Sequence, residues 1–125
     1  YGGWNATHGG TTLDGSEGAG AIGLATWQRD RLAGLRAGRV AGKLNTKPRT
    51  VGSELHLNAD ASGGSVAVGL NIDGRPVSGM DVSNCVPITT DSLDHVVRWR
   101  GDVTPPPGDV EVVVQISNAE VFSLW

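Results

Sequence analysis

The stretch DVEVVVQISNAEVFSLW, residues 109–125, is the most informative part of this 125-residue chain. Four apolar side chains alternate along its first half, so an extended strand places all of them on one face. They are Val110, Val112, Val114 and Ile116. A second strand is expected beyond Asn118-Ala119, and we predict that Phe122 and Leu124 line its core face. The pattern is typical of two half-buried strands in direct succession.

The same period-two alternation recurs elsewhere, between turn signals. The alternating segments are 21–29, 53–59, 65–72 and 95–100. Asp73-Gly74 follows the third of these and is a strong signal for a tight turn. Glycine, valine and threonine are abundant, and long runs of helix-forming residues are absent. Strands recurring roughly every 8–12 residues predict a single all-β domain, an antiparallel β-sandwich or jelly roll of the concanavalin-like type.

The alternation also assigns side chains to faces. The residues expected on the core face of their strands are Leu55, Leu57, Val97 and Trp99. The outer face of segment 53–59 is expected to carry Glu54, His56 and Asn58. Segment 21–29 is expected to be a strand with Ile22, Leu24 and Thr26 on one face and Trp27 on the other. Residues 29–39 are read as a turn that enters a further strand, because Gly34 and Gly38 weaken a helix there.

Composition and charge exclude several classes of protein. The net charge is −3 and 18% of the residues are charged, so the chain lacks the basic stripe that nucleic acid binding needs. The same balance argues against binding to an anionic membrane, and no apolar run reaches the roughly 18 residues of a membrane span. Cys85 is the single cysteine, so we expect a buried, unreactive thiol rather than a disulfide or a cysteine-bound zinc ion.

No motif predicts catalysis or a metal centre. The histidines lie in separate segments without the spacing of a zinc site; they are His8, His56 and His95. Calcium is the one cofactor that the sequence leaves possible, because two turns are rich in the oxygen ligands that it prefers. These turns hold Asn58 with Asp60 and Asn71 with Asp73. No nucleophile elbow is present, and the acidic residues lie mostly in turns. We therefore predict no catalytic residue, no metal ligand and no enzyme activity.

Tryptophan is unusually frequent among the aromatic residues. The chain has one tyrosine and one phenylalanine but four tryptophans, which are Trp4, Trp27, Trp99 and Trp125. Sugar rings present apolar faces that stack on indole, while neighbouring polar groups bind the hydroxyls. Trp99 shares a face with Val97 and is assigned to the core. We therefore predict carbohydrate binding at Trp4 and Trp27, with His8 and Arg29 as the polar partners.

The first twenty residues differ from the rest. The chain begins YGGW, and residues 5–20 are a glycine-rich, low-complexity stretch without periodicity. We therefore divide the chain into residues 1–20, an N-terminal strand and glycine-rich loop, and residues 21–125, the β-sandwich domain. YGGW is expected to be either frayed or paired with an element distant in the sequence, such as the sheet edge of a second copy.

Several motifs occur in an order that resembles one known group of proteins. The group is the bacterial five-bladed β-propeller glycosidase-like proteins related to glycoside hydrolase families 32 and 43. Their last propeller strand, YYGGW-x-x-x-H, and the segment IGLA-x-x-RRDGF-x-SL lead into a C-terminal β-sandwich. The matching stretches here are YGGW, AIGLATWQRDRLAGL, DGRPVSG, CVPITTDSLDHVVRW and EVFSLW. The chain departs from the pattern at Arg31, where the group has glycine, and at Ala33 and Gly34, where it has bulkier residues.

The resemblance implies an accessory sandwich without the catalytic propeller, so no catalytic residue is carried over. The expected function is a non-catalytic module of glycoside hydrolase origin that binds carbohydrate. The alternative is a structural module that self-associates or docks on a neighbouring propeller domain, because exposed apolar patches and free strand edges recruit partners. The localisation stays open, and only the resemblance suggests a secreted or periplasmic protein.

Overall fold

The computed structural model describes residues 2–4 and 20–125, and this part of the chain contains strands and turns but no helix. Near the N-terminus, β1 (Gly2–Trp4) pairs antiparallel with β2 (Gly20–Ile22). The remaining strands are β3 (Leu35–Ala37), β4 (Gly42–Asn45), β5 (Arg49–Thr50), β6 (His56–Asp60), β7 (Ser65–Ile72), β8 (Arg75–Pro76), β9 (Asp91–Val96), β10 (Asp109–Ser117) and β11 (Ala119–Leu124). The described residues contain no helix long and apolar enough to cross a bilayer.

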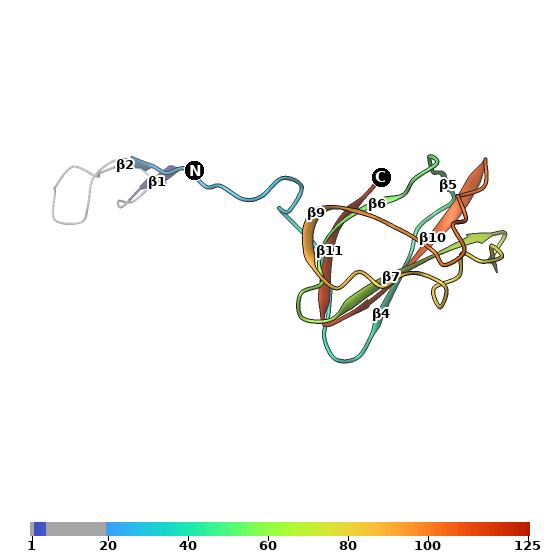
Figure 1. Cartoon of the computed structure of the whole chain (residues 1–125). Coiled ribbons are helices and arrows are strands. Elements are labelled where there is room, and N and C mark those ends of the chain that lie inside the picture. The colour runs from blue at the N-terminus through green and yellow to red at the C-terminus, as the bar shows by residue number, and fades with distance from the viewer. Residues whose placement is uncertain (1, 5–19) are drawn as a thin grey trace, which may run out of the picture.

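Two antiparallel sheets form the body of the protein (Figure 1). One has four strands in the order β3-β11-β6-β9. The other has five, in the order β4-β10-β7-β8, with β5 also paired to β10. The structure thus confirms the predicted all-β fold as a single antiparallel β-sandwich. The β1–β2 hairpin lies apart from it, at the end of an extended segment (Figure 1).

The core lies between the inner faces of the two sheets. β10 contributes four side chains that are almost completely buried, as the alternation predicts, namely Val110, Val112, Val114 and Ile116. The opposite sheet and its flanks contribute the predicted Leu55, Leu57, Val97 and Trp99. The Trp99 indole N–H donates to the Val68 carbonyl oxygen at 2.8 Å, so its polar atom is satisfied inside the core. Cys85 is also buried, as expected.

The three connections that join strands of different sheets at one end of the sandwich lie close together. They are residues 38–41 between β3 and β4, residues 61–64 between β6 and β7, and Asn118 between β10 and β11. Asn118 has a left-handed backbone with φ of 44°, and its N–H donates to the Gly38 carbonyl at 2.9 Å. These crossings close the lower end of the sandwich in Figure 1. Longer connections leave the other end more open.

The predicted turn at Asp73-Gly74 is confirmed. It joins β7 to β8 with Ile72 opposite Arg75, so two residues form the hairpin loop. Both have positive φ, 50° and 73°, as a type I′ turn requires. Glycine adopts that conformation without strain, and aspartate tolerates it better than most residues.

Two expectations about strands are wrong. Segment 21–29 is not one strand, because β2 ends at Ile22 and residues 23–28 lie in no strand. The alternating residues of this segment therefore do not belong to a strand of either sheet. Within one chain, YGGW pairs with the next strand rather than with a more distant element, because Gly2–Trp4 pairs with Gly20–Ile22.

The face assigned to Phe122 is also wrong. The pairing of β11 with β6 shifts register between Val121 and Ser123, where a β-bulge inserts an extra residue. Ala119 and Val121 therefore face the core before the bulge and Leu124 packs against it afterwards. Phe122 instead lies under the guanidinium of Arg31, 4.6 Å from its ring centroid. The prediction that Leu124 lies on the core face is confirmed.

The crowded closed end yields a test of the fold. A Cβ atom added at Gly64 would lie 2.0 Å from the Ser117 carbonyl oxygen, so the backbone would have to move. We expect Gly64→Ala to lower the free energy of unfolding by about 2 kcal/mol or more, measured by urea denaturation. Gly38→Ala is the matched control, since its Cβ would have no neighbour within 4 Å. Equal stabilities of the two variants would contradict this packing.

Candidate functional site

An aromatic and ionic surface lies at the open end of the sandwich, beside the C-terminus. Trp125 continues β11 beside His56, at the start of β6. The His56 N–H donates to the Trp125 carbonyl at 2.8 Å, and the Trp125 N–H donates to the His56 carbonyl at 3.1 Å. Their side chains are stacked, with ring centroids 5.7 Å apart and an interplanar angle of 16°. One face of the indole thus rests on the imidazole, while 42% of the residue stays exposed.

Charged side chains continue this surface on both sides of His56. Asp94 Oδ1 lies 2.6 Å from His56 Nδ1, and Glu54 Oε2 lies 4.0 Å from His56 Nε2. Glu54 also forms an ion pair with Arg98, with Oε1 and Nη2 2.9 Å apart. All three charged side chains are about half exposed or more. We call these five residues, Glu54, His56, Asp94, Arg98 and Trp125, the Trp125 surface.

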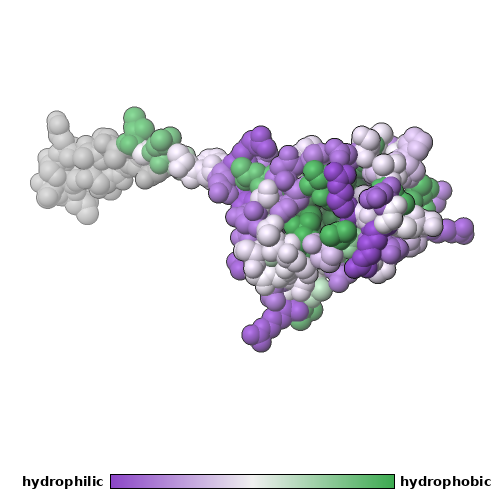
Figure 2. Space-filling view, in the orientation of Figure 1, coloured by the Kyte–Doolittle hydropathy of each residue, from purple (hydrophilic) through white to green (hydrophobic). Residues whose placement is uncertain are grey.

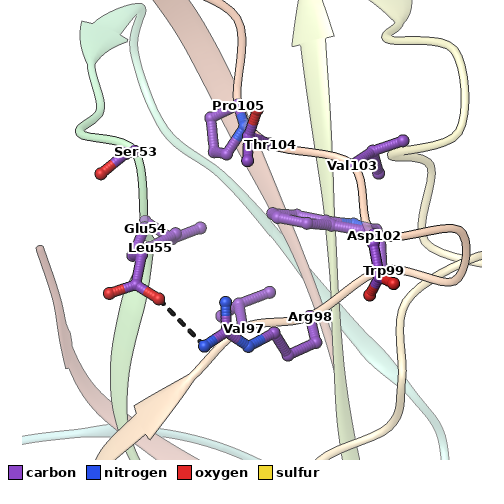
Figure 3. A pocket seen from close by; sticks show the side chains of 10 residues that line it. All are labelled: Ser53, Glu54, Leu55, Val97, Arg98, Trp99, Asp102, Val103, Thr104 and Pro105. Carbon is purple, nitrogen blue, oxygen red and sulfur yellow. Dashed lines mark ion pairs between the residues drawn. The ribbon is translucent and has the colours of Figure 1, made fainter.

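A pocket of about 260 Å³ adjoins the Trp125 surface. Figure 3 shows the Glu54–Arg98 ion pair at one side of it, with the Trp99 ring and Asp102 opposite Glu54. The pocket is lined by Ser53, Glu54, Leu55, Val97, Arg98, Trp99, Asp102, Val103, Thr104 and Pro105. These residues come from the connections before β6 and after β9. A left-handed turn at Gly101 and Asp102, with φ of 91° and 49°, directs the chain around the pocket.

Of the four predicted carbohydrate-binding residues, the structure describes the side chains of Trp27 and Arg29. His8 and the side chain of Trp4 lie outside the described residues. Trp27 is exposed on the extended segment before the sandwich. Arg29 is exposed as well, with its guanidinium 3.6 Å from Asp30. The pockets at the open end are lined by other residues, so Trp27 and Arg29 do not form a site with the Trp125 surface.

Sequence reasoning missed the Trp125 surface, although part of its signal was visible. The alternation in 53–59 places Glu54 and His56 on the outer face of their strand, opposite the buried Leu55 and Leu57. Nothing in the sequence shows that Trp125 stacks on His56, since the two residues are 69 positions apart. That contact depends on the pairing of β11 with β6.

Asn58 was expected to face outward, yet it is completely buried. The segment before β3 crosses the outer face of the four-stranded sheet and covers it there. Arg31 Nε donates to Asn58 Oδ1 at 2.8 Å, and Asn58 Nδ2 donates to the Arg29 carbonyl at 3.1 Å. Arg31 Nη2 also reaches Asp91 Oδ1 at 2.5 Å and the Ser92 carbonyl at 3.0 Å. This polar cluster is satisfied internally and attaches the segment to the sheet.

Two further carboxylates, Asp60 and Asp81, have structural partners, and the thiol of Cys85 is buried. The Ser62 and Ser83 hydroxyls donate to Asp60 and Asp81, and these hydrogen bonds hold the pKa of each carboxyl below its usual value. Burial raises the pKa of the Cys85 thiol, which disfavours the reactive thiolate. Asn58 and Asp60 were left open as calcium ligands. In the structure, each residue has a side-chain oxygen that accepts a hydrogen bond from another group of the protein. The described residues contain no group of three side chains suited to a metal ion.

Comparison with known proteins provides no further guide. No protein-family model matches the chain, and neither the curated proteins nor the solved structures include a significant match.

The polar cluster of Arg31, Asn58 and Asp91 provides a second test of the fold. Arg31→Ala would leave the buried Asn58 amide oxygen without its donor and Asp91 without its cation. We expect this change to lower the free energy of unfolding by about 2–4 kcal/mol, measured by urea denaturation. Arg29→Ala is the matched control, because its side chain is exposed and the carbonyl that binds Asn58 remains. We expect less than about 0.5 kcal/mol for the control. A stable Arg31→Ala protein would show that the cluster is dispensable.

Proposed function

We propose that this protein is a non-catalytic β-sandwich module that binds carbohydrate at the Trp125 surface. The observation that carries the proposal is the exposed indole of Trp125, held flat against His56 and bordered by two carboxylates and a guanidinium. The sequence-based expectation of a sugar-binding tryptophan is kept in this proposal. Its location moves from Trp4 and Trp27 to Trp125.

The chemistry of the Trp125 surface suits a sugar ring. The C–H groups of a pyranose present an apolar face that stacks on indole, and the free face of Trp125 supplies such a platform. Glu54 and Asp94 accept hydrogen bonds from hydroxyl groups, whereas Arg98 donates them. Because these side chains are partly exposed, a ligand could reach them without unfolding any strand. The adjoining pocket adds the hydroxyl groups of Ser53 and Thr104.

The same arrangement favours binding over hydrolysis. Glycoside cleavage commonly uses two carboxyl groups that flank the scissile bond, with open space between them. Here the His56 ring lies between Glu54 and Asp94 and fills that space. The ring nitrogens face these two carboxylates, and no serine or threonine hydroxyl is among the partners recorded for His56 in the described part of the chain. A nucleophile activated by histidine would need such a hydroxyl within hydrogen-bond reach.

The order of motifs along the chain supports an accessory role beside a glycoside hydrolase-type propeller. In that role, a module that holds carbohydrate raises the local concentration of substrate for a linked catalytic domain. This part of the proposal depends on the resemblance of short motifs.

The test is a titration of a glycan panel followed by intrinsic tryptophan fluorescence. We expect at least one glycan to change the emission of the full chain. Trp125→Ala should weaken that binding about fivefold or more, because stacking on an aromatic ring contributes on the order of 1 kcal/mol. Trp125→Phe should restore part of the affinity, since it keeps an aromatic face.

Trp27→Ala is the matched control, because Trp27 is exposed but lies outside the Trp125 surface. It should bind as tightly as the parent chain. A flat response to every glycan would contradict carbohydrate binding altogether. Binding that survives in Trp125→Ala and is lost in Trp27→Ala would place the site on the extended segment instead.

A further inference from the structure

A second cavity lies at the edge of the four-stranded sheet and shares no residue with the Trp125 surface or its pocket. It is an open groove of about 410 Å³ between β11 and β4. Its apolar walls are formed by Leu35, Leu44, Val121, Phe122 and Leu124. On the face of the sandwich shown in Figure 2, apolar residues form separate patches among polar ones. An apolar groove on such a surface, with a volume in the range of about 300–1,000 Å³, is typical of a small-molecule site.

The strand β3 blocks one end of this groove. β3 pairs with β11 only from Ala119 to Val121, so Leu35 stands where the groove begins. Leu44 and Leu124 also pack against the core, so the apolar walls continue toward the interior of the sandwich. The groove is therefore a slot with one blocked end. Such a slot fits a ligand with a single apolar tail better than a strand that passes along the edge.

The other end of the groove carries its only charged residue. Arg49 pairs with Val110 near the start of β10, which places it toward the open end of the sandwich. It is the single charged residue among those that line the groove. No ion pair joins Arg49 to a carboxylate in the described part of the chain. A guanidinium that borders an apolar surface without an acidic partner favours an anionic ligand group.

A backbone donor is available at the same end. His56 and Trp125 exchange both of their backbone hydrogen bonds. Antiparallel strands alternate such pairs with pairs that exchange none, so the N–H of Leu124, opposite Leu57, points away from β6. β3 does not extend this far along β11, and no acceptor for this N–H is recorded among the described residues. The groove thus has two donors toward its open end and apolar walls beyond them.

We propose that this groove binds a monocarboxylate with an apolar tail, of the chemical class of a medium-chain fatty acid. The carboxylate lies at the open end, where the Arg49 guanidinium and the Leu124 N–H donate hydrogen bonds to its oxygens. The tail extends past Leu44 toward Leu35 and is removed from water by the apolar walls. A sugar would instead leave hydroxyl groups unpaired against these walls. This site therefore selects a different chemistry from that of the Trp125 surface.

The test is a titration of the isotope-labelled chain with decanoate, followed by nuclear magnetic resonance. We expect saturable shifts of the backbone amides that line the groove, with Leu44 and Leu124 among them. Decylammonium has a tail of the same length and the opposite charge. It should bind at least about tenfold more weakly, because its ammonium group would face Arg49. Equal affinity for the two probes, or shifts confined to the Trp125 surface, would overturn the proposal.

Two pairs of variants test the two ends of the groove. Arg49→Gln should weaken decanoate binding about fivefold or more, because it removes the cation. Arg75→Gln is its control, since it makes the same charge change in β8, at the far edge of the five-stranded sheet. Leu35→Asp should weaken binding at least about tenfold, because it places a charge in the path of the tail. Val40→Asp is its control, since Val40 is 88% exposed and lies in the β3–β4 connection. Both controls should bind decanoate like the parent chain.

Thermal unfolding should show that all four variants are folded, and Arg49→Gln changes only an exposed side chain. A parent chain without saturable decanoate binding would overturn the proposal. An Arg49→Gln protein that binds decanoate as tightly as the parent would also overturn it, because the tail alone would then account for association. Acetyl-trivaline presents a carboxylate at the end of a short apolar peptide. If it binds more tightly than decanoate, the groove is assigned to the C-terminus of a protein partner instead.

Discussion

The direct passage of the chain from β10 to β11 is the constraint on which the rest of this structure depends. β10 lies inside one sheet, between β4 and β7, and β11 lies inside the other, between β3 and β6. A single residue, Asn118, turns the chain from one sheet to the other with a left-handed backbone. Because two internal strands are tied at this corner, the sheets must meet there. The other two crossings then pack against the same corner, and Gly64 has no room for a side chain.

The candidate site lies at the end of the sandwich that these crossings leave open. The connections that precede β6 and follow β9 are free to carry polar side chains at the open end, where they border a pocket. β11 ends there as well, so its last residue, Trp125, is presented at the rim and supported by His56. On the outer face, Arg31 attaches the segment that precedes β3, using Asn58 as an internal partner.

The sequence predicted the parts of the fold that depend on local pattern. Alternation placed Val112 and Leu57 in the core and Asp73-Gly74 in a tight turn, because a strand with one buried face must repeat every two residues. It failed at Phe122, where a bulge adds one residue and reverses the faces that follow. It placed Asn58 on the outer face but could not show that the residue is buried there, because the covering side chain, Arg31, is 27 residues away in the sequence.

By itself, then, the sequence determined that this protein is all-β, that β10 and β11 are strands and that the core is built from alternating aliphatic residues. These properties follow from hydrophobic burial acting on a backbone with a period of two. Only the tertiary structure decided which strands are neighbours, and with them the location of the candidate site. Trp125 meets His56 through pairing between strands far apart in the chain, and such pairing depends on the packing of the whole sandwich.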